Sequence, residues 1–187
     1  MKQNNIEKIL TNNPIVPVVT FNSVSEVDAV IQKLLAQNIK CIEITLRTGA
    51  ALDSIAYIKK KYKDTFCVGM GTVTNTNHVK EAQNLQVDFM VSPGISRTLS
   101  ASLERTYIPY ISGVSTPSDI IKAINLGNDV LKFFPANLFG GIDALKTYGQ
   151  VFPNVKFCPT GGINEKNYND YLSLPNVIAV GGSWVVK

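Results

Sequence analysis

The sequence predicts an α/β fold in which eight parallel strands alternate with helices. Short apolar or β-branched runs recur along the 187 residues, and most intervals between them have helical spacing. Several runs also end in glycine, which is typical of strand-to-loop turns. We expect one domain, residues 1–187, because a chain of this length buries one substantial core.

Eight runs are predicted strands. They cover residues 15–20, 40–46, 66–72, 89–93, 107–113, 130–135, 155–161 and 177–182. Between the first two, apolar residues recur at three and four residue intervals from Val27 to Leu35, and Ser23 or Ser25 is a candidate cap. Further helices are predicted around Leu52 to Tyr62, over 116–126 and over 164–172, the last two opening with Thr or Asn.

Such a chain can form an open doubly wound sheet or a closed barrel. Two observations favour the (β/α)8, or TIM, barrel. Gly69 and Gly71 lack the third glycine of a dinucleotide-binding fingerprint, and charged residues interrupt apolar strands, where a lumen would receive them. Little chain follows Gly182, so we expect the last helix to be absent: either a C-terminal segment is missing, or another element covers that surface.

Composition excludes several classes of function. The net charge of +4 is mild, and the compact basic cluster around Lys60 is typical of a solvated helix face, so no nucleic-acid partner is expected. No run resembles a signal peptide or membrane span, which favours a cytoplasmic location. The three cysteines lie far apart in apolar runs and are interpreted as reduced core residues.

The second predicted strand carries charge on one face. Side chains alternate along a strand, so Glu43, Thr45 and Arg47 lie opposite the isoleucines between them. If the polar face points into a lumen, Glu43 lies deep and Arg47 lies about 13 Å further along, near the rim. Glu43 would then handle protons and Arg47 would bind an anion. A structural ion pair, or an edge strand with one wet face, remains an alternative.

Lys132 lies in the sixth run, which is too apolar for an exposed strand. Burial of an unpaired ammonium costs several kcal/mol, so this lysine is expected to be neutral, paired or both. A neutral amine is the nucleophile that attacks a carbonyl. The alternative is a lysine whose stem packs while its head reaches solvent.

Glycine-rich turns follow the last strands. Thr160, Gly161 and Gly162 follow the seventh, and Gly182 and Ser183 follow the eighth. Loops at these positions of a barrel often bind phosphate through backbone N–H groups.

Three other residues carry weaker signals. Thr72 and Pro93 end strands and could line the mouth of the barrel, although turn chemistry explains them equally well. His78 is the one histidine of the sequence, so a histidine-bound metal is not expected, while an all-oxygen Mg²⁺ site stays open.

Eight segments together resemble the 2-keto-3-deoxy-6-phosphogluconate (KDPG) and 4-hydroxy-2-oxoglutarate (KHG) aldolase family. They are residues 14–18 (PIVPV), 42–48 (IEITLRT), 71–73 (GTV), 92–94 (SPG), 113–116 (GVST), 132–136 (KFFPA), 157–163 (FCPTGGI) and 181–184 (GGSW). The resemblance runs from Pro14 to the end of the chain.

The resemblance implies a role for each matching residue. Lys132 would form a Schiff base, Glu43 would be the general acid/base and Arg47 would bind the substrate carboxylate. Thr72 and Pro93 would line the pyruvate end of the substrate, and Phe134 would lie beside the lysine. Thr160 would also contact the substrate. The phosphate would be bound by Gly161, Gly162, Gly182 and Ser183.

The implied reaction is the reversible cleavage of KDPG to pyruvate and glyceraldehyde 3-phosphate, and of KHG to pyruvate and glyoxylate. No metal or organic cofactor is implied, the partners are small keto acids, and family members are usually homotrimers. A phosphogalactonate aldolase is the nearest alternative, although the arginine of residues 43–47 (EITLR) disfavours it. A barrel that binds a phosphorylated ligand without cleaving it is the alternative from another class.

Overall fold

The computed structural model describes the backbone of residues 2–187 and the side chains of residues 5–187. Eight parallel strands follow one another around a ring in the order β7-β6-β5-β4-β3-β2-β1-β8. They are β1 (Ile15–Val19), β2 (Cys41–Thr45), β3 (Cys67–Gly71), β4 (Phe89–Val91), β5 (Tyr110–Val114), β6 (Val130–Phe133), β7 (Lys156–Pro159) and β8 (Val180–Gly182). Bridges from Phe157 to Val177 and from Thr160 to Gly181 close the ring between β7 and β8, which confirms the barrel.

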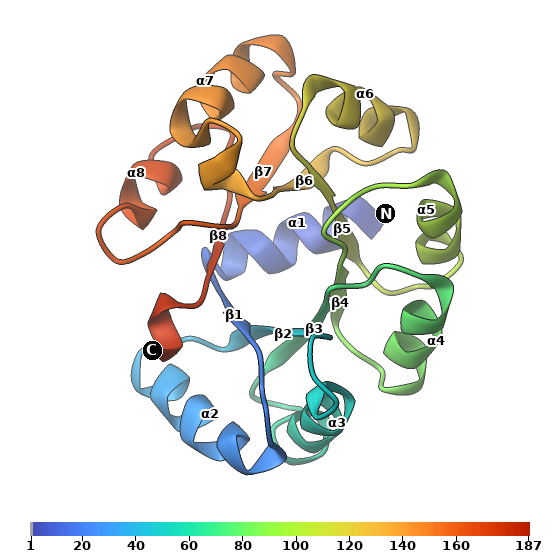
Figure 1. The fold of residues 1–187 in the computed structure, drawn as a ribbon, viewed down its shortest axis with the longest axis vertical. Coiled ribbons are helices and arrows are strands. Elements are labelled where there is room, and N and C mark those ends of the chain that lie inside the picture. The colour runs from blue at the N-terminus through green and yellow to red at the C-terminus, as the bar shows by residue number, and fades with distance from the viewer. Residues whose placement is uncertain (1) are drawn as a thin grey trace.

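All the helices but the first surround the ring, and the first crosses one end of it (Figure 1). The helices are α1 (Lys2–Asn12), α2 (Val27–Ala36), α3 (Ala51–Lys61), α4 (Thr76–Asn84), α5 (Arg97–Glu104), α6 (Pro117–Asn125), α7 (Gly141–Val151) and α8 (Tyr168–Leu172), with 3-10 turns η1 (Val24–Glu26), η2 (Ala136–Leu138) and η3 (Trp184–Val186). Among the described residues, no helix is both long and apolar enough to cross a membrane.

All eight predicted strands are present, and their ends lie within two residues of the predicted bounds except at the starts of β5 and β8. Strand β5 begins later than predicted, after Pro109, which has no N–H to donate to a neighbouring strand. The predicted helix over 164–172 is reduced to α8, because the Asn167 side chain accepts from the backbone N–H of Asn164 and holds a turn there. Ser23 and Thr116 act as the caps of η1 and α6.

The sequence prediction missed α1, which covers the amino end of the barrel. In Figure 1 this helix crosses behind the strands. Its Ile6 and Leu10 are fully buried and pack in one cluster with lumen side chains, among them Val16, Cys41 and Val130. The end of the barrel opposite the glycine-rich turns is therefore closed by apolar contacts.

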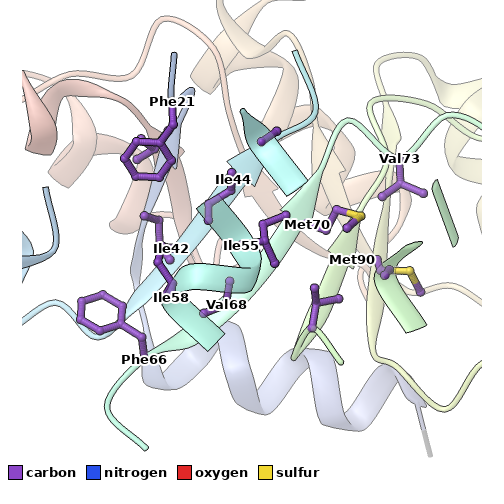
Figure 2. Close-up of a cluster of buried hydrophobic side chains, with 14 of the residues drawn as sticks. Phe21, Ile42, Ile44, Ile55, Ile58, Phe66, Val68, Met70, Val73 and Met90 are labelled. Carbon is purple, nitrogen blue, oxygen red and sulfur yellow. The ribbon is translucent and has the colours of Figure 1, made fainter. Parts of the chain in front are cut away.

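A second apolar layer lies between the strands and the outer helices. Figure 2 shows Ile42 and Ile44 of β2 beside Val68 and Met70 of β3, with Ile55 of α3 packed against them. These β2 residues alternate with Glu43 and Thr45, as the predicted pattern requires. The isoleucines therefore face the helices, and the polar side chains face the lumen.

Little structure follows β8 in the described chain. The short turn η3 ends at Val186, and the Trp184 ring stacks on Tyr168 with centroids 5.7 Å apart.

Candidate active site

A buried ion pair lies in the middle of the barrel. The Nζ of Lys132 donates to both carboxylate oxygens of Glu43, at 3.0 Å and 3.2 Å. Lys132 is 5% exposed and Glu43 is 4% exposed. Strands β6 and β2 lie on opposite sides of the ring, so the two side chains meet across the lumen.

This pair decides the alternatives that the sequence left open. The Lys132 head does not reach solvent, since its ammonium is buried against Glu43. Strand β2 is not an edge strand, because it pairs with both β1 and β3. Glu43 is paired with Lys132 from across the barrel, rather than with Arg47 of its own segment.

Gly71 makes room for the carboxylate. A Cβ atom at this position of β3 would lie 2.3 Å from Oε1 of Glu43, closer than real contacts allow. Strand β3 pairs with β2 in parallel, and Gly71 lies beside Thr45 in the register. The glycine of residues 71–73 (GTV) therefore has a steric reason: a larger residue would displace Glu43 toward Lys132 or out of the pair.

Two neighbours shape the surroundings of the amine. The Lys132 Nζ lies 5.4 Å from the centre of the Phe134 ring, a distance that allows a cation–π interaction. Cys158 of β7 is the register partner of Lys132. Burial raises the pKa of the Cys158 thiol to about 12, so this sulfur stays protonated and does not compete with the amine as a nucleophile.

A cavity of about 410 Å³ opens above the pair at the carboxyl ends of β1, β2, β6, β7 and β8. Seven of the residues predicted for the site line it: Arg47, Phe134, Thr160, Gly161, Gly162, Gly182 and Ser183. Lys132 and Glu43 are not in its lining, but Phe134 is, and that ring contacts the lysine amine. The cavity and the ion pair are thus adjacent parts of one site.

The loops after β7 and β8 form one wall of this cavity. Thr160 bridges to Gly181, and its hydroxyl is buried without a well-formed hydrogen bond to the described residues. Gly162 has a φ of 72°, and a Cβ there would lie 2.4 Å from the Cβ of Asn137. Only glycine fits this turn without strain, and the turn brings peptide groups to the cavity.

Thr72 and Pro93 are not in the lining of this cavity. Thr72 follows β3 with a φ of 64°, a left-handed conformation that is uncommon for threonine. Pro93 follows β4, and its carbonyl group packs so closely on Gly113 that a Cβ there would lie 2.2 Å away. Both residues end strands at the same end of the barrel as the site.

Thr20 is a cavity-lining residue that the sequence prediction missed. Its hydroxyl lies 2.6 Å from that of Thr45, the lumen residue next above Glu43 on β2. Thr20 directly follows β1 in the structure, whereas the sequence prediction included it in the strand. A lone threonine after a strand is common in turns, so nothing in the sequence singles it out.

The loop after β5 is held by Asp119. Its carboxylate accepts hydrogen bonds from the backbone and side chains of Ser115 and Thr116, and it completes a capping box at the start of α6. Burial of Asp119 opposes its ionisation, but the bonds from Thr116 and Ser115 outweigh this and hold its pKa below the usual value. The Ser115 carbonyl also accepts from the Tyr148 hydroxyl.

The arrangement is suited to carbonyl chemistry. A carboxylate 3.0 Å from an ammonium can accept its proton and release a neutral, nucleophilic amine inside an enclosed lumen. Arg47 supplies a cation at the cavity wall, where an anionic ligand would be held. Among the described residues, no group of three or more His, Cys, Asp or Glu side chains is placed to hold a metal ion.

Known proteins are similar to this chain in sequence and in fold. A family model described as KDPG and KHG aldolase matches residues 6–187. The 2-dehydro-3-deoxy-phosphogluconate aldolase of Dickeya dadantii is 40% identical over 96% of this chain and 84% of its own length. The KHG/KDPG aldolase of Escherichia coli K12 is 39% identical with the same coverage of both chains.

Solved structures agree with this match. The KDPG aldolase of Legionella pneumophila, with pyruvate captured at low pH as a covalent carbinolamine intermediate, superposes with a TM-score of 0.93 at 38% identity, covering 96% of this chain and 87% of its own. The 2-keto-3-deoxy-6-phosphogluconate aldolase of Zymomonas mobilis ZM4 with 3-phosphoglycerate gives 0.94 at 35% identity, covering 99% and 88%. By sequence, fold and site geometry, this chain belongs to the KDPG and KHG aldolase family.

Proposed function

We propose that this protein is a metal-independent Schiff-base aldolase. It cleaves 2-keto-3-deoxy-6-phosphogluconate reversibly to pyruvate and glyceraldehyde 3-phosphate, and 4-hydroxy-2-oxoglutarate to pyruvate and glyoxylate. The observation that carries the proposal is the buried pair of Lys132 and Glu43 below an open cavity. A relative 38% identical to this chain holds pyruvate as a covalent carbinolamine, which supports the same chemistry here.

In the proposed mechanism, Lys132 acts first. Its neutral amine adds to the C2 carbonyl, and loss of water gives a protonated imine that withdraws electrons from C3. Glu43, directly or through a water molecule, removes the proton of the C4 hydroxyl, and the C3–C4 bond breaks. The aldehyde leaves, the enamine is reprotonated at C3, and water hydrolyses the imine to release pyruvate and the free amine.

Other residues of the site orient the substrate in this proposal. Arg47 binds the C1 carboxylate, since a guanidinium matches a carboxylate with two parallel hydrogen bonds. The turns that contain Gly161, Gly162, Gly182 and Ser183 bind the phosphate at the far side of the cavity. Phe134 and Thr160 lie along the wall, and Thr72 and Pro93 flank the pyruvate end.

Borohydride reduction in the presence of pyruvate tests the proposal. One reduced pyruvyl unit should be added to the peptide that carries Lys132, as mass spectrometry would show. The exposed Lys80 offers a matched control: Lys80→Met should still form the adduct and Lys132→Met should not. An unmodified Lys132 under saturating pyruvate would reject the Schiff base and favour a barrel that only binds its ligand. Full activity in EDTA is expected as well.

We further propose that residues 1–187 work as one catalytic domain, in the cytoplasm, as a homotrimer. The location and the trimer rest on the family resemblance. Sedimentation equilibrium should give three times the chain mass, and a monomer across the concentration range would contradict the trimer.

A further inference from the structure

The hydroxyl of Thr20 is placed to receive a hydrogen bond from a ligand in the cavity. It lies 2.6 Å from the Thr45 hydroxyl, and Thr45 also donates to the Val19 carbonyl at 3.3 Å. A hydroxyl has one hydrogen, and a carbonyl can only accept. Only one arrangement makes hydrogen bonds of both contacts: Thr45 donates to the Val19 carbonyl, and Thr20 donates to Thr45 across the short contact.

This arrangement determines whether Thr20 can donate or accept a hydrogen bond with a ligand in the cavity. The Thr20 hydroxyl already donates its one hydrogen to Thr45, so toward a ligand it can only accept a hydrogen bond. Thr45 is 1% exposed and is fixed by the strand, which holds Thr20 in this state. A carboxylate or phosphate oxygen beside Thr20 would face another acceptor. A ligand hydroxyl would instead find a partner there.

The ring order places Thr20 between the residues proposed to bind the two ends of the substrate. Strand β1 lies between β2, which leads to Arg47, and β8, which leads to Gly182 and Ser183. With the carboxylate at Arg47 and the phosphate at the β7 and β8 turns, the intervening carbons pass the end of β1. In the proposed mechanism Glu43 takes the proton of the C4 hydroxyl, which leaves the C5 hydroxyl for Thr20.

We infer that Thr20 is a specificity-determining residue that accepts a hydrogen bond from the C5 hydroxyl of the phosphorylated six-carbon substrate. This rests on the proposed function. The shorter substrate, 4-hydroxy-2-oxoglutarate, has a carboxylate at C5, whose oxygens only accept. Thr20 therefore favours cleavage of the sugar phosphate over the shorter keto acid, through one hydrogen bond that the second substrate cannot donate.

The test compares kcat/KM for both substrates in wild type, Thr20→Val and Thr20→Ser. Valine keeps the shape of threonine and removes the acceptor, so the ratio of KDPG to KHG cleavage should fall by about tenfold, the worth of one good hydrogen bond. Serine keeps the hydroxyl and should restore the ratio. Thr65→Val, at the opposite end of the barrel, is the control and should leave the ratio unchanged.

A substrate without the C5 hydroxyl completes the test. The 5-deoxy analogue of KDPG should be cleaved about tenfold less well by wild type, and Thr20→Val should cause no further loss on it. Additive losses, or an equal fall on KDPG and KHG, would show that Thr20 acts only by holding Thr45 and would overturn the inference. An unchanged ratio in an active enzyme rejects Thr20 alone, whereas a wild type that cleaves neither substrate rejects the proposed function with it.

Discussion

The two ends of the barrel are built from the same strands, but the amino end is packed with apolar side chains and the carboxyl end holds buried charges and a cavity. At the amino end, Ile6 and Leu10 of α1 seal the lumen against Cys41 of β2 and Val130 of β6. The next lumen side chains on β2 and β6, Glu43 and Lys132, form the ion pair, and above them the cavity opens.

This difference separates stability from chemistry along a single strand. Apolar burial at the amino end stabilises the fold by removing surface from water. It also gives the ion pair a dry floor, and a low dielectric strengthens the interaction of an amine with a carboxylate. The carboxyl end gives up that packing and keeps buried charges instead, whose desolvation costs several kcal/mol.

The largest expected effect is the loss of activity in Lys132→Met. Removal of the proposed nucleophile should lower kcat/KM for KDPG by about 10⁴-fold or more, measured by coupled pyruvate release. Glu43 would be left buried without its cation, which should cost about 3–5 kcal/mol of unfolding free energy. In Lys132→Met/Glu43→Gln that loss should largely disappear while activity stays absent. If Lys132→Met/Glu43→Gln were less stable than Lys132→Met, the polar groups at the carboxyl end of the barrel would be shown to stabilise the fold.

Glu43→Gln should have the next largest effect on activity. It should separate imine formation at Lys132 from the cleavage step that follows it. Without a group to move protons, turnover should fall by about 10²- to 10⁴-fold. The amide still occupies the space beside Gly71, so borohydride should still trap pyruvate on Lys132. Single-turnover cleavage and adduct yield are the two measurements. Cleavage at the wild-type rate would remove Glu43 from the proposed mechanism.

Leu10→Ala tests the amino end. Leu10 is 1% exposed within the apolar seal, and its truncation should lower the unfolding free energy by about 2–5 kcal/mol in urea titrations. The ion pair and cavity lie on the other side of the lumen floor, so kcat of the folded protein should change little. Exposed Leu138 supplies the control, since Leu138→Ala should cost far less. A large fall in kcat with unchanged stability would abolish the distinction between the two ends.

Asp119→Asn should give the smallest effect, and one that depends on pH. The capping box at α6 contributes about 1 kcal/mol at pH 7. Because hydrogen bonds hold the folded pKa of Asp119 below its usual value of 3.8, this stabilisation is present above about pH 4 and is lost as the pH falls through the folded pKa. The gap in unfolding free energy between wild type and variant should therefore narrow below pH 4. If the difference in unfolding free energy between wild type and Asp119→Asn stayed constant below pH 4, the charge of Asp119 would not contribute to the effect.

Pattern and turn chemistry made much of the fold predictable. The alternation of Ile42, Glu43, Ile44 and Thr45 correctly predicts the lumen face of β2, because side chains on a strand alternate. Helix α1 was missed, since its mostly polar sequence carries a weak apolar stripe and its burial depends on a lumen that exists only after eight strands assemble. Long-range burial of this kind leaves little local signal.

The sequence by itself determined the fold class, through the periodicity of its apolar residues, and the glycine-rich turns, through backbone sterics. It also predicted that Lys132 is buried, and the cost of burying a charge made this lysine a candidate for function. Only the tertiary structure decided which group faces that lysine. Glu43 and Lys132 are far apart in the chain, on strands at opposite sides of the ring, and closure of the barrel brings them within 3.0 Å. The same closure placed Thr20 against Thr45 at the cavity wall.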